Sequence, residues 1–404
     1  MAASSYFTSQ KHNYSQGTNW SATRVLMGDG TWVDKANPIY VANTVFVSKL
    51  GDDATGAVQR FDLPFLTIAA ARTATLAYWT GGTAPSATNR IRIVVQSGRY
   101  LEKIVLANFV DWDLTNSIIE LQAGAFYTID DDNVACDSII YGNPQIIRST
   151  SGTGGCIRTQ NAGTNLRIYA DSITSSIGGV SGTIYCVNGT QYIKVVNNIV
   201  VTGVVQIPIT CDNGNQTVEA LSISGNSGVR TITCNGGNQI VTAYNGTWTP
   251  TQDVFYCNGG NQTIYSDGTT SGLGDAAIFV GGTQTIYGNL VGARYGASSF
   301  GGGTQTIYGN ISSIAGSTNV VLCSAGATQI INNSRISAPA NVSCLKQQSG
   351  GVSIINNCTL LTSGTGKSIA DGSTVILNTP CGGNKALGTA ITKGCSLTIS
   401  SDIQ

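Results

Sequence analysis

The chain has 404 residues, of which 41% are hydrophobic and only 10% are charged, and its 21 basic and 21 acidic side chains give a formal net charge of zero. No basic stripe points to a nucleic-acid partner, and no run approaches the 18 apolar residues of a membrane span. Fifty glycines among so few charges are typical of an all-β chain of short strands and tight turns.

Residues 1–43 are polar, have no sustained periodicity and contain His12, the single histidine. They predict an arm and not a domain. Because His12 lies in this arm, we expect neither a Ser-His-Asp triad nor imidazole metal ligands in the body of the protein, and we expect no metal and no cofactor. The start of the chain has no cationic and apolar signal segment, which indicates synthesis in a reducing cytoplasm.

A first strand is predicted at Thr44-Val45-Phe46-Val47-Ser48. Farther on, apolar side chains follow the spacing of three and four residues that marks one face of a helix. These are Leu66, Ala69, Ala70, Thr73, Leu76 and Ala77. We therefore predict that residues 44–90 hold a first strand and a helix over 65–79, and that this helix caps the open end of the structure that follows.

The next segment, Ile91 to Leu106, predicts a strand, a tight turn at Ser97-Gly98 and a second strand. Four motifs in residues 44–106 are Val-Phe-Val-Ser, Gly-Asp-Asp, Pro-Phe-x-Thr-Ile-x-x-Ala and Ile-x-Val-x-x-Gly-x-Tyr-x-Glu. Together they resemble the opening of pectate-lyase-like right-handed parallel β-helix proteins. The resemblance implies the fold more than the function, since this fold hosts lyases, hydrolases, adhesins and virus tailspikes.

A repeat organises the middle of the chain, and its clearest copies are Gly-Gly-Thr-Gln-Thr-Ile-Tyr-Gly-Asn at 281–289 and 302–310. Aligned copies place one residue at Gln191, Gln216, Gln239, Gln262, Gln284, Gln305, Gln329 and Ser353, with separations of 21 to 25 residues. Two positions later comes an unbroken aliphatic column: Ile193, Val218, Val241, Ile264, Ile286, Ile307, Ile331 and Ile355. This alternation indicates strands, and the period predicts a right-handed parallel β-helix over residues 91–404 with about 21 to 25 residues per coil.

The eleven cysteines do not predict disulfides. Five residues before the aligned glutamines lie Cys186, Cys211, Cys234, Cys257, Phe279 and Phe300, and Cys323 is displaced by one inserted residue. Exchange of Cys for Phe suits a buried apolar position and not a bridge, so we expect unpaired buried thiols.

Acidic residues on neighbouring coils are the place to look for polysaccharide-cleaving chemistry. Asp253 and Asp275 both lie nine residues before their aligned glutamines, and Arg230 holds the same position one coil earlier. Stacking would bring the carboxyl groups to about 5 Å, the separation of a retaining glycosidase, but this pattern favours ordinary turn aspartates whose side chains diverge into solvent. The run Asp130-Asp131-Asp132 predicts a solvated turn, and Lys194 with Glu219 predicts a surface ion pair.

Tyrosines define a second candidate surface. Tyr265, Tyr287 and Tyr308 are expected to stack on one outward face, with Asp267, Asn289 and Asn310 two residues farther along. Such a face could bind a glycan, pack against other copies of the chain in a trimer, or be structural filler.

The segment Arg24-Val25-Leu26-Met27-Gly28-Asp29-Gly30-Thr31-Trp32-Val33 resembles the attachment regions of bacteriophage tail fibres and related virion fibres. This resemblance implies a non-enzymatic, homotrimeric fibre or spike protein of the virion, made in the host cytoplasm. It would bind other virion proteins through residues 1–43 and present its coils to a host-cell surface polysaccharide. The alternatives are a polysaccharide depolymerase and a bacterial adhesin, the latter disfavoured by the missing signal.

Overall fold

The computed structural model describes most of the chain from residue 41 onward. The described ranges are 24–26, 32–34, 41–80, 84–121, 127–149, 154–176, 182–202, 207–225, 230–244, 253–272, 274–314, 317, 319–324, 326–348, 350–363, 369–370, 374–378, 381–383 and 396–399. His12 and Cys395 lie outside them, as does most of the predicted arm. Within the arm, β1 (Arg24–Leu26) and β2 (Trp32–Asp34) form an antiparallel pair.

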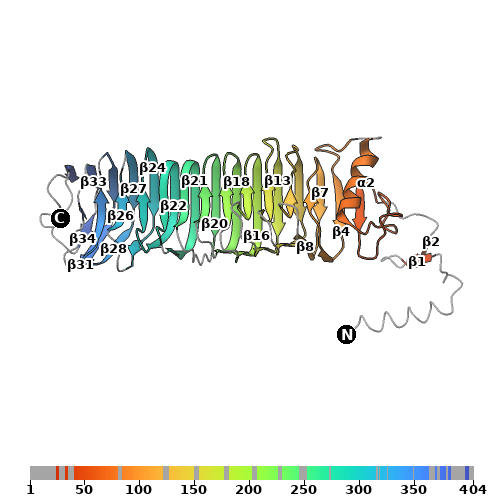
Figure 1. Cartoon of the computed structure of the whole chain (residues 1–404), viewed down its shortest axis with the longest axis horizontal. Helices are drawn as coiled ribbons and strands as arrows, with labels where there is room; N and C mark the ends of the chain where they lie inside the picture. Colours follow the sequence, from red (N-terminus) through yellow and green to blue (C-terminus); the bar gives the residue numbers. More distant parts are fainter. Residues whose placement is uncertain are drawn as a thin grey trace, which may run out of the picture.

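From β3 onward the chain is a β-solenoid whose strands stack along one long axis (Figure 1). One parallel ladder, here called ladder A, runs through the whole stack. Its strands are β3 (Thr44–Val47), β4 (Ile91–Val95), β7 (Val110–Asp113), β10 (Asp137–Tyr141), β13 (Asn165–Ala170), β16 (Thr190–Val201), β18 (Asn215–Gly225), β20 (Asn238–Ala243), β21 (Asp253–Gly272), β22 (Ala277–Gly292), β24 (Gly303–Tyr308), β27 (Ala327–Asn332), β30 (Val352–Asn356), β33 (Thr374–Asn378) and β35 (Ser396–Ile399).

Two further sets of strands complete the coils. Ladder B contains β6 (Ile104–Val105), β9 (Ile129–Asp130), β12 (Ile157–Thr159), β15 (Ile184–Cys186), β17 (Ile209–Cys211), β19 (Arg230–Cys234), the first part of β21 and of β22, β23 (Ala297–Ser299), β26 (Asn319–Cys323), β29 (Ser343–Gln347) and β32 (Ile369–Ala370). The third set contains β5 (Gly98–Tyr100), β8 (Ser117–Leu121), β11 (Gln145–Arg148), β14 (Ser172–Ser175), the last parts of β16, β18, β21 and β22, β25 (Ile311–Ser313), β28 (Arg335–Ala340), β31 (Thr359–Ser363) and β34 (Gly382–Gly383). The predicted parallel β-helix is therefore confirmed, and its right-handed sense stays a prediction.

The register of ladder A agrees with the aligned repeat. Gln216 pairs with Gln191 and with Gln239, and the same pairing continues through Gln329 to Ser353. Each member of the aliphatic column has a fully buried side chain, as predicted from period-two alternation. The strand pairing of ladder A extends beyond Ser353, the last position of the aligned repeat, since β33 pairs with β30 and β35 pairs with β33.

The cysteine column is confirmed with one correction. Cys186, Cys211, Cys234, Cys257 and Phe279 pair in sequence along ladder B and are buried. The next partner of Phe279 is Ser299 and not Phe300, and Ser299 in turn pairs with Cys323. The extra residue that shifts Cys323 thus enters one coil earlier than predicted. All ten cysteines in the described part of the chain are buried and unpaired.

The predicted helix is present as α2 (Ile68–Thr80), at the end of the stack next to β4 (Figure 1). Thr67 begins it, since its Oγ1 accepts a hydrogen bond from the Ala70 N–H (3.1 Å). Ile68, Ala71 and Trp79 are buried within the apolar core of the solenoid. The face predicted from the spacing of Leu66, Ala69, Ala70, Thr73, Leu76 and Ala77 is wrong, because Leu66 and Leu76 are exposed and the helix buries the neighbouring face. Its role as a cap stays a prediction. No helix in the described part of the chain is both long and apolar enough to cross a membrane.

Candidate functional site

The two aspartates predicted as a catalytic pair lie on neighbouring coils and touch. The backbone N–H of Asp275 donates to Oδ1 of Asp253 (3.2 Å), and Arg230 pairs with Asp253 in the sheet, with its Nε 3.9 Å from Oδ2. The Arg230 guanidinium also lies 3.3 Å from the ring centre of Tyr256. Burial raises the pKa of the Asp253 carboxyl, and the nearby charge of Asp275 adds to this effect.

The carboxylate of Asp275 is fully buried and both of its oxygens are occupied. Oδ1 accepts from Nε of Arg294 (2.7 Å), and Oδ2 accepts from Oγ of Ser298 (2.5 Å). A nucleophile must reach the sugar it attacks, and this carboxylate has no exposed surface. The arrangement suits a structural ion pair that joins three coils, and the predicted catalytic role gains no support from it.

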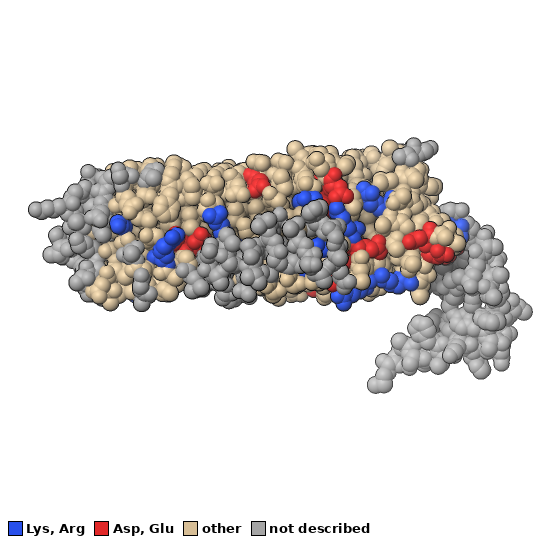
Figure 2. All heavy atoms as spheres, in the orientation of Figure 1, with Lys and Arg blue, Asp and Glu red and all other residues tan. Residues whose placement is uncertain are grey.

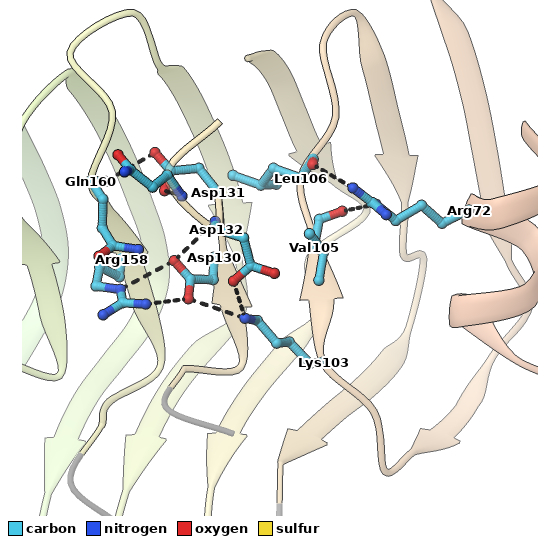
Figure 3. Close-up of polar contacts among 10 residues, drawn as sticks. Arg72, Lys103, Val105, Leu106, Asp130, Asp131, Asp132, Arg158 and Gln160 are labelled. Carbon is cyan, nitrogen blue, oxygen red and sulfur yellow. Dashed lines mark hydrogen bonds and ion pairs between the residues drawn. The ribbon is translucent and has the colours of Figure 1, made fainter. Parts of the chain in front are cut away.

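The acidic run is not the solvated turn that the sequence suggested. Asp130 and Asp131 are fully buried, while Asp132 remains exposed (Figure 3). Asp130 accepts two hydrogen bonds from Arg158 (2.6 and 3.1 Å) and one from Lys103 (3.1 Å). Burial alone would raise the pKa of Asp130, but the hydrogen bonds from Arg158 and the charge of Lys103 outweigh it, and the pKa is lowered.

Asp131 has a different set of partners, because its side chain turns away from these cations. Its Oδ2 accepts from the backbone N–H of Gln160 (2.9 Å; Figure 3). The same oxygen accepts from the backbone N–H of Asn161 (2.9 Å) and from the hydroxyl of Thr164 (2.7 Å). Asp130 and Asp131 therefore connect neighbouring coils through hydrogen bonds and ion pairs. No cluster of three or more His, Cys, Asp or Glu side chains suitable for a metal ion occurs among the described residues.

The three tyrosines do form a stack on the outer face of ladder A. Their ring centres are 4.8 Å apart at both steps, with interplanar angles of 4° between Tyr265 and Tyr287 and 5° between Tyr287 and Tyr308. Nearly parallel rings at the coil spacing cover each other's faces, so the middle ring presents its edge and hydroxyl to solvent. A sugar packs its apolar side against an open ring face, which Tyr287 lacks.

The polar residues beside the tyrosines are partly rearranged. A register shift after Tyr265 places Thr269, and not Asp267, opposite Asn289. Asn289 Oδ1 accepts from the backbone N–H of Asn310 (2.9 Å), and Asn310 Oδ1 accepts from the backbone N–H of Arg335 (3.0 Å). These asparagine oxygens thus link successive coils.

The aligned glutamines are a feature whose role the sequence analysis missed. From Gln216 to Gln329, each buried Nε2 donates to Oε1 of the glutamine one coil earlier, at 2.6 to 3.1 Å. Gln191 starts the chain of bonds by donating to Thr159 Oγ1 (3.0 Å). Alternation could have revealed this, because a residue two positions before a buried aliphatic residue shares its inward direction.

Charged side chains are unevenly distributed along the rod. Figure 2 shows more of them toward the end that holds α2. Between residues 300 and 399, the described part of the chain contains two charged residues, Arg335 and Lys346. The predicted surface pair of Lys194 and Glu219 is confirmed, with Nζ and Oε2 3.7 Å apart.

The fold and these surfaces define a parallel β-solenoid protein whose outer face carries a stack of tyrosines. Comparison with known proteins adds no narrower identity, because no family model, no curated protein and no solved structure matches the chain. The resemblance to pectate-lyase-like proteins is therefore supported at the level of the parallel β-helix alone.

Proposed function

We propose that the chain is a non-enzymatic fibre or spike protein of a virion, which presents its solenoid surface for attachment to a host cell. The observation that supports this most is the outer face of ladder A, which repeats one set of neutral side chains over successive coils. Thr263, Tyr265, Thr285, Tyr287 and Thr306 belong to this face. A face that is uniform over such a length suits extended contact better than a localised reaction.

The environment of the carboxylates also favours attachment over cleavage. The buried carboxylate of Asp275 is bound by Arg294 and Ser298, and the buried carboxylate of Asp130 is bound by Lys103 and Arg158. A glycoside hydrolase needs two carboxyl groups that flank an accessible sugar bond. Attachment through residues 1–43 to other virion proteins and a position in the virion are parts of the same proposal, and they are supported by the sequence resemblance of that segment.

The test uses the purified full-length chain and a panel of purified bacterial capsular polysaccharides and lipopolysaccharides. Retention of the chain on at least one immobilised polysaccharide, without release of reducing ends, is the expected result. Release of reducing ends that disappears in Asp253→Asn or Asp275→Asn would replace the proposal with a depolymerase. Absence of binding across a panel taken from hosts whose phages carry this chain would also contradict it.

A further inference from the structure

We infer that Arg148 binds a small carboxylate, or another planar anion that offers two oxygens, at a buried site of the solenoid. Arg148 is the last residue of β11, and its side chain is fully buried. Its Nη1 donates to the backbone carbonyl of Leu121 (3.1 Å), while Nε and Nη2 have no hydrogen-bond partner among the described residues. These two nitrogens form the edge of the guanidinium that binds a carboxylate through two parallel hydrogen bonds.

Three other arginines of this chain show what that edge binds. In each of them, Nε and Nη2 donate side by side to the two oxygens of one aspartate. The pairs are Arg60 with Asp62 (2.8 and 2.6 Å), Arg90 with Asp111 (2.7 and 2.6 Å) and Arg158 with Asp130 (3.1 and 2.6 Å). Arg148 presents the same edge, but no carboxylate from the described part of the chain binds it.

The position of Arg148 holds neutral side chains on the neighbouring coils. Arg148 pairs with Leu121 on one side and with Ser175 on the other. Ser175 pairs in turn with Val201, and all four side chains are buried, so they form an inward column of the third set of strands. A guanidinium keeps its proton throughout the physiological pH range, and a buried charge without a counterion is strongly disfavoured. This column therefore favours an anion at the level of Arg148.

Two acidic groups lie near Arg148, and neither supplies that anion. Glu120 lies on the opposite face of β8, where Arg99 and Ser149 donate to its carboxylate. Cys156 is the second group, but burial raises the pKa of its thiol in spite of the nearby guanidinium of Arg148. Cys156 is therefore a neutral thiol at physiological pH. The counterion has to come from outside the described part of the chain.

The burial of Arg148 limits what can bind there. The side chain has no solvent-exposed surface, so the anion must be small. Two oxygens in one plane match the parallel N–H groups of Nε and Nη2, whereas a spherical anion meets both groups only through bent hydrogen bonds. Formate is the smallest carboxylate and has this geometry, which makes it the appropriate probe.

The test measures urea unfolding of the full-length chain in sodium formate and in sodium chloride at equal ionic strength. Formate bound to the folded chain stabilises it. Above the dissociation constant, each tenfold rise in formate should therefore lower the unfolding equilibrium constant about tenfold, and chloride should not. Arg148→Met removes the guanidinium and keeps an unbranched side chain, and we expect it to lose this dependence. Arg167→Met is the matched control, because Arg167 is an exposed arginine of β13, and it should keep the dependence.

Two further measurements decide the matter even where Arg148→Met fails to fold. Arg148→Lys keeps the positive charge but lacks the pair of parallel N–H groups, so it should also lose the dependence on formate. Wild type should broaden the proton resonance of formate, and an equal concentration of chloride should not reverse this. The inference is overturned by wild-type unfolding that responds equally to formate and chloride, by a formate dependence that persists in either Arg148 variant, or by the absence of line broadening.

Discussion

The buried chain of glutamine amides allows a sharp prediction about stability. In Gln262→Leu, two buried side-chain groups lose their partners, namely Oε1 of Gln239 and one N–H of Gln284, and the Tyr256 carbonyl loses the bond that it accepts from Gln262 (3.3 Å). Each unpaired buried group costs about 1–3 kcal/mol, so the variant should lower the free energy of unfolding by roughly 2–6 kcal/mol before the gain from the apolar leucine. Gln284→Leu orphans two groups in the same way, namely Oε1 of Gln262 and an N–H of Gln305.

The double variant Gln262→Leu/Gln284→Leu is the decisive case. It again leaves two orphaned groups, now Oε1 of Gln239 and an N–H of Gln305, so it should cost about as much as either single variant. Urea unfolding followed by circular dichroism measures all three. Gln145→Leu, at an exposed position of β11, is the control and should change stability by less than about 0.5 kcal/mol. If the double variant is destabilised by the sum of the two single effects, the chain of amides does not act as a unit and the reasoning is wrong.

Three further outcomes follow from the buried polar groups. Folding lowers the pKa of Asp130, so the ionised carboxylate stabilises the protein above its unfolded pKa of about 3.9. This stabilisation is lost as the pH falls from there through the folded pKa. Asp130→Asn should therefore make the free energy of unfolding less dependent on pH in this acidic range. Asp275→Asn should lower the free energy of unfolding by about 1–3 kcal/mol through loss of the charge-assisted bond from Arg294, and an unchanged urea midpoint would show that the ion pair contributes nothing. Burial raises the pKa of the Cys344 thiol to about 12, so this thiol should react with a thiol reagent at pH 8 after unfolding and not before. Cys344→Ala should therefore lower by one the number of thiols that become reactive on unfolding, and an unchanged number would contradict the prediction.

The fold could be predicted because its determinants are local and periodic. Strand alternation fixes which side chains point inward, and a repeated coil applies that choice at every level of the stack. Ile286 and Ile307 are equivalent in the sequence and equivalent in the core. The position of Ser299 was missed because one extra residue lies in the turn between Ser299 and Gln305, so that counting back five residues from Gln305 reaches Phe300.

The candidate site could be predicted only in part. Proximity followed from the coil spacing, so the tyrosine stack and the contact between Asp253 and Asp275 were both expected. The hydrogen-bond partners of a given side chain could not be predicted from the coil spacing, because they lie on other coils and at positions outside the repeat. Arg294 and Ser298 seal Asp275, and neither lies at a position that the repeat singles out.

The chain of glutamine amides also bears on how the length of the rod can change. Each glutamine donates from Nε2 to the glutamine one coil earlier, and its Oε1 accepts from the glutamine one coil later. A duplicated coil inserted between Gln284 and Gln305 would therefore find both its donor and its acceptor in place. The near-identical copies at 281–289 and 302–310 are what such a duplication would leave behind. Length would then grow in steps of about 4.8 Å, one coil at a time, without redesign of the core.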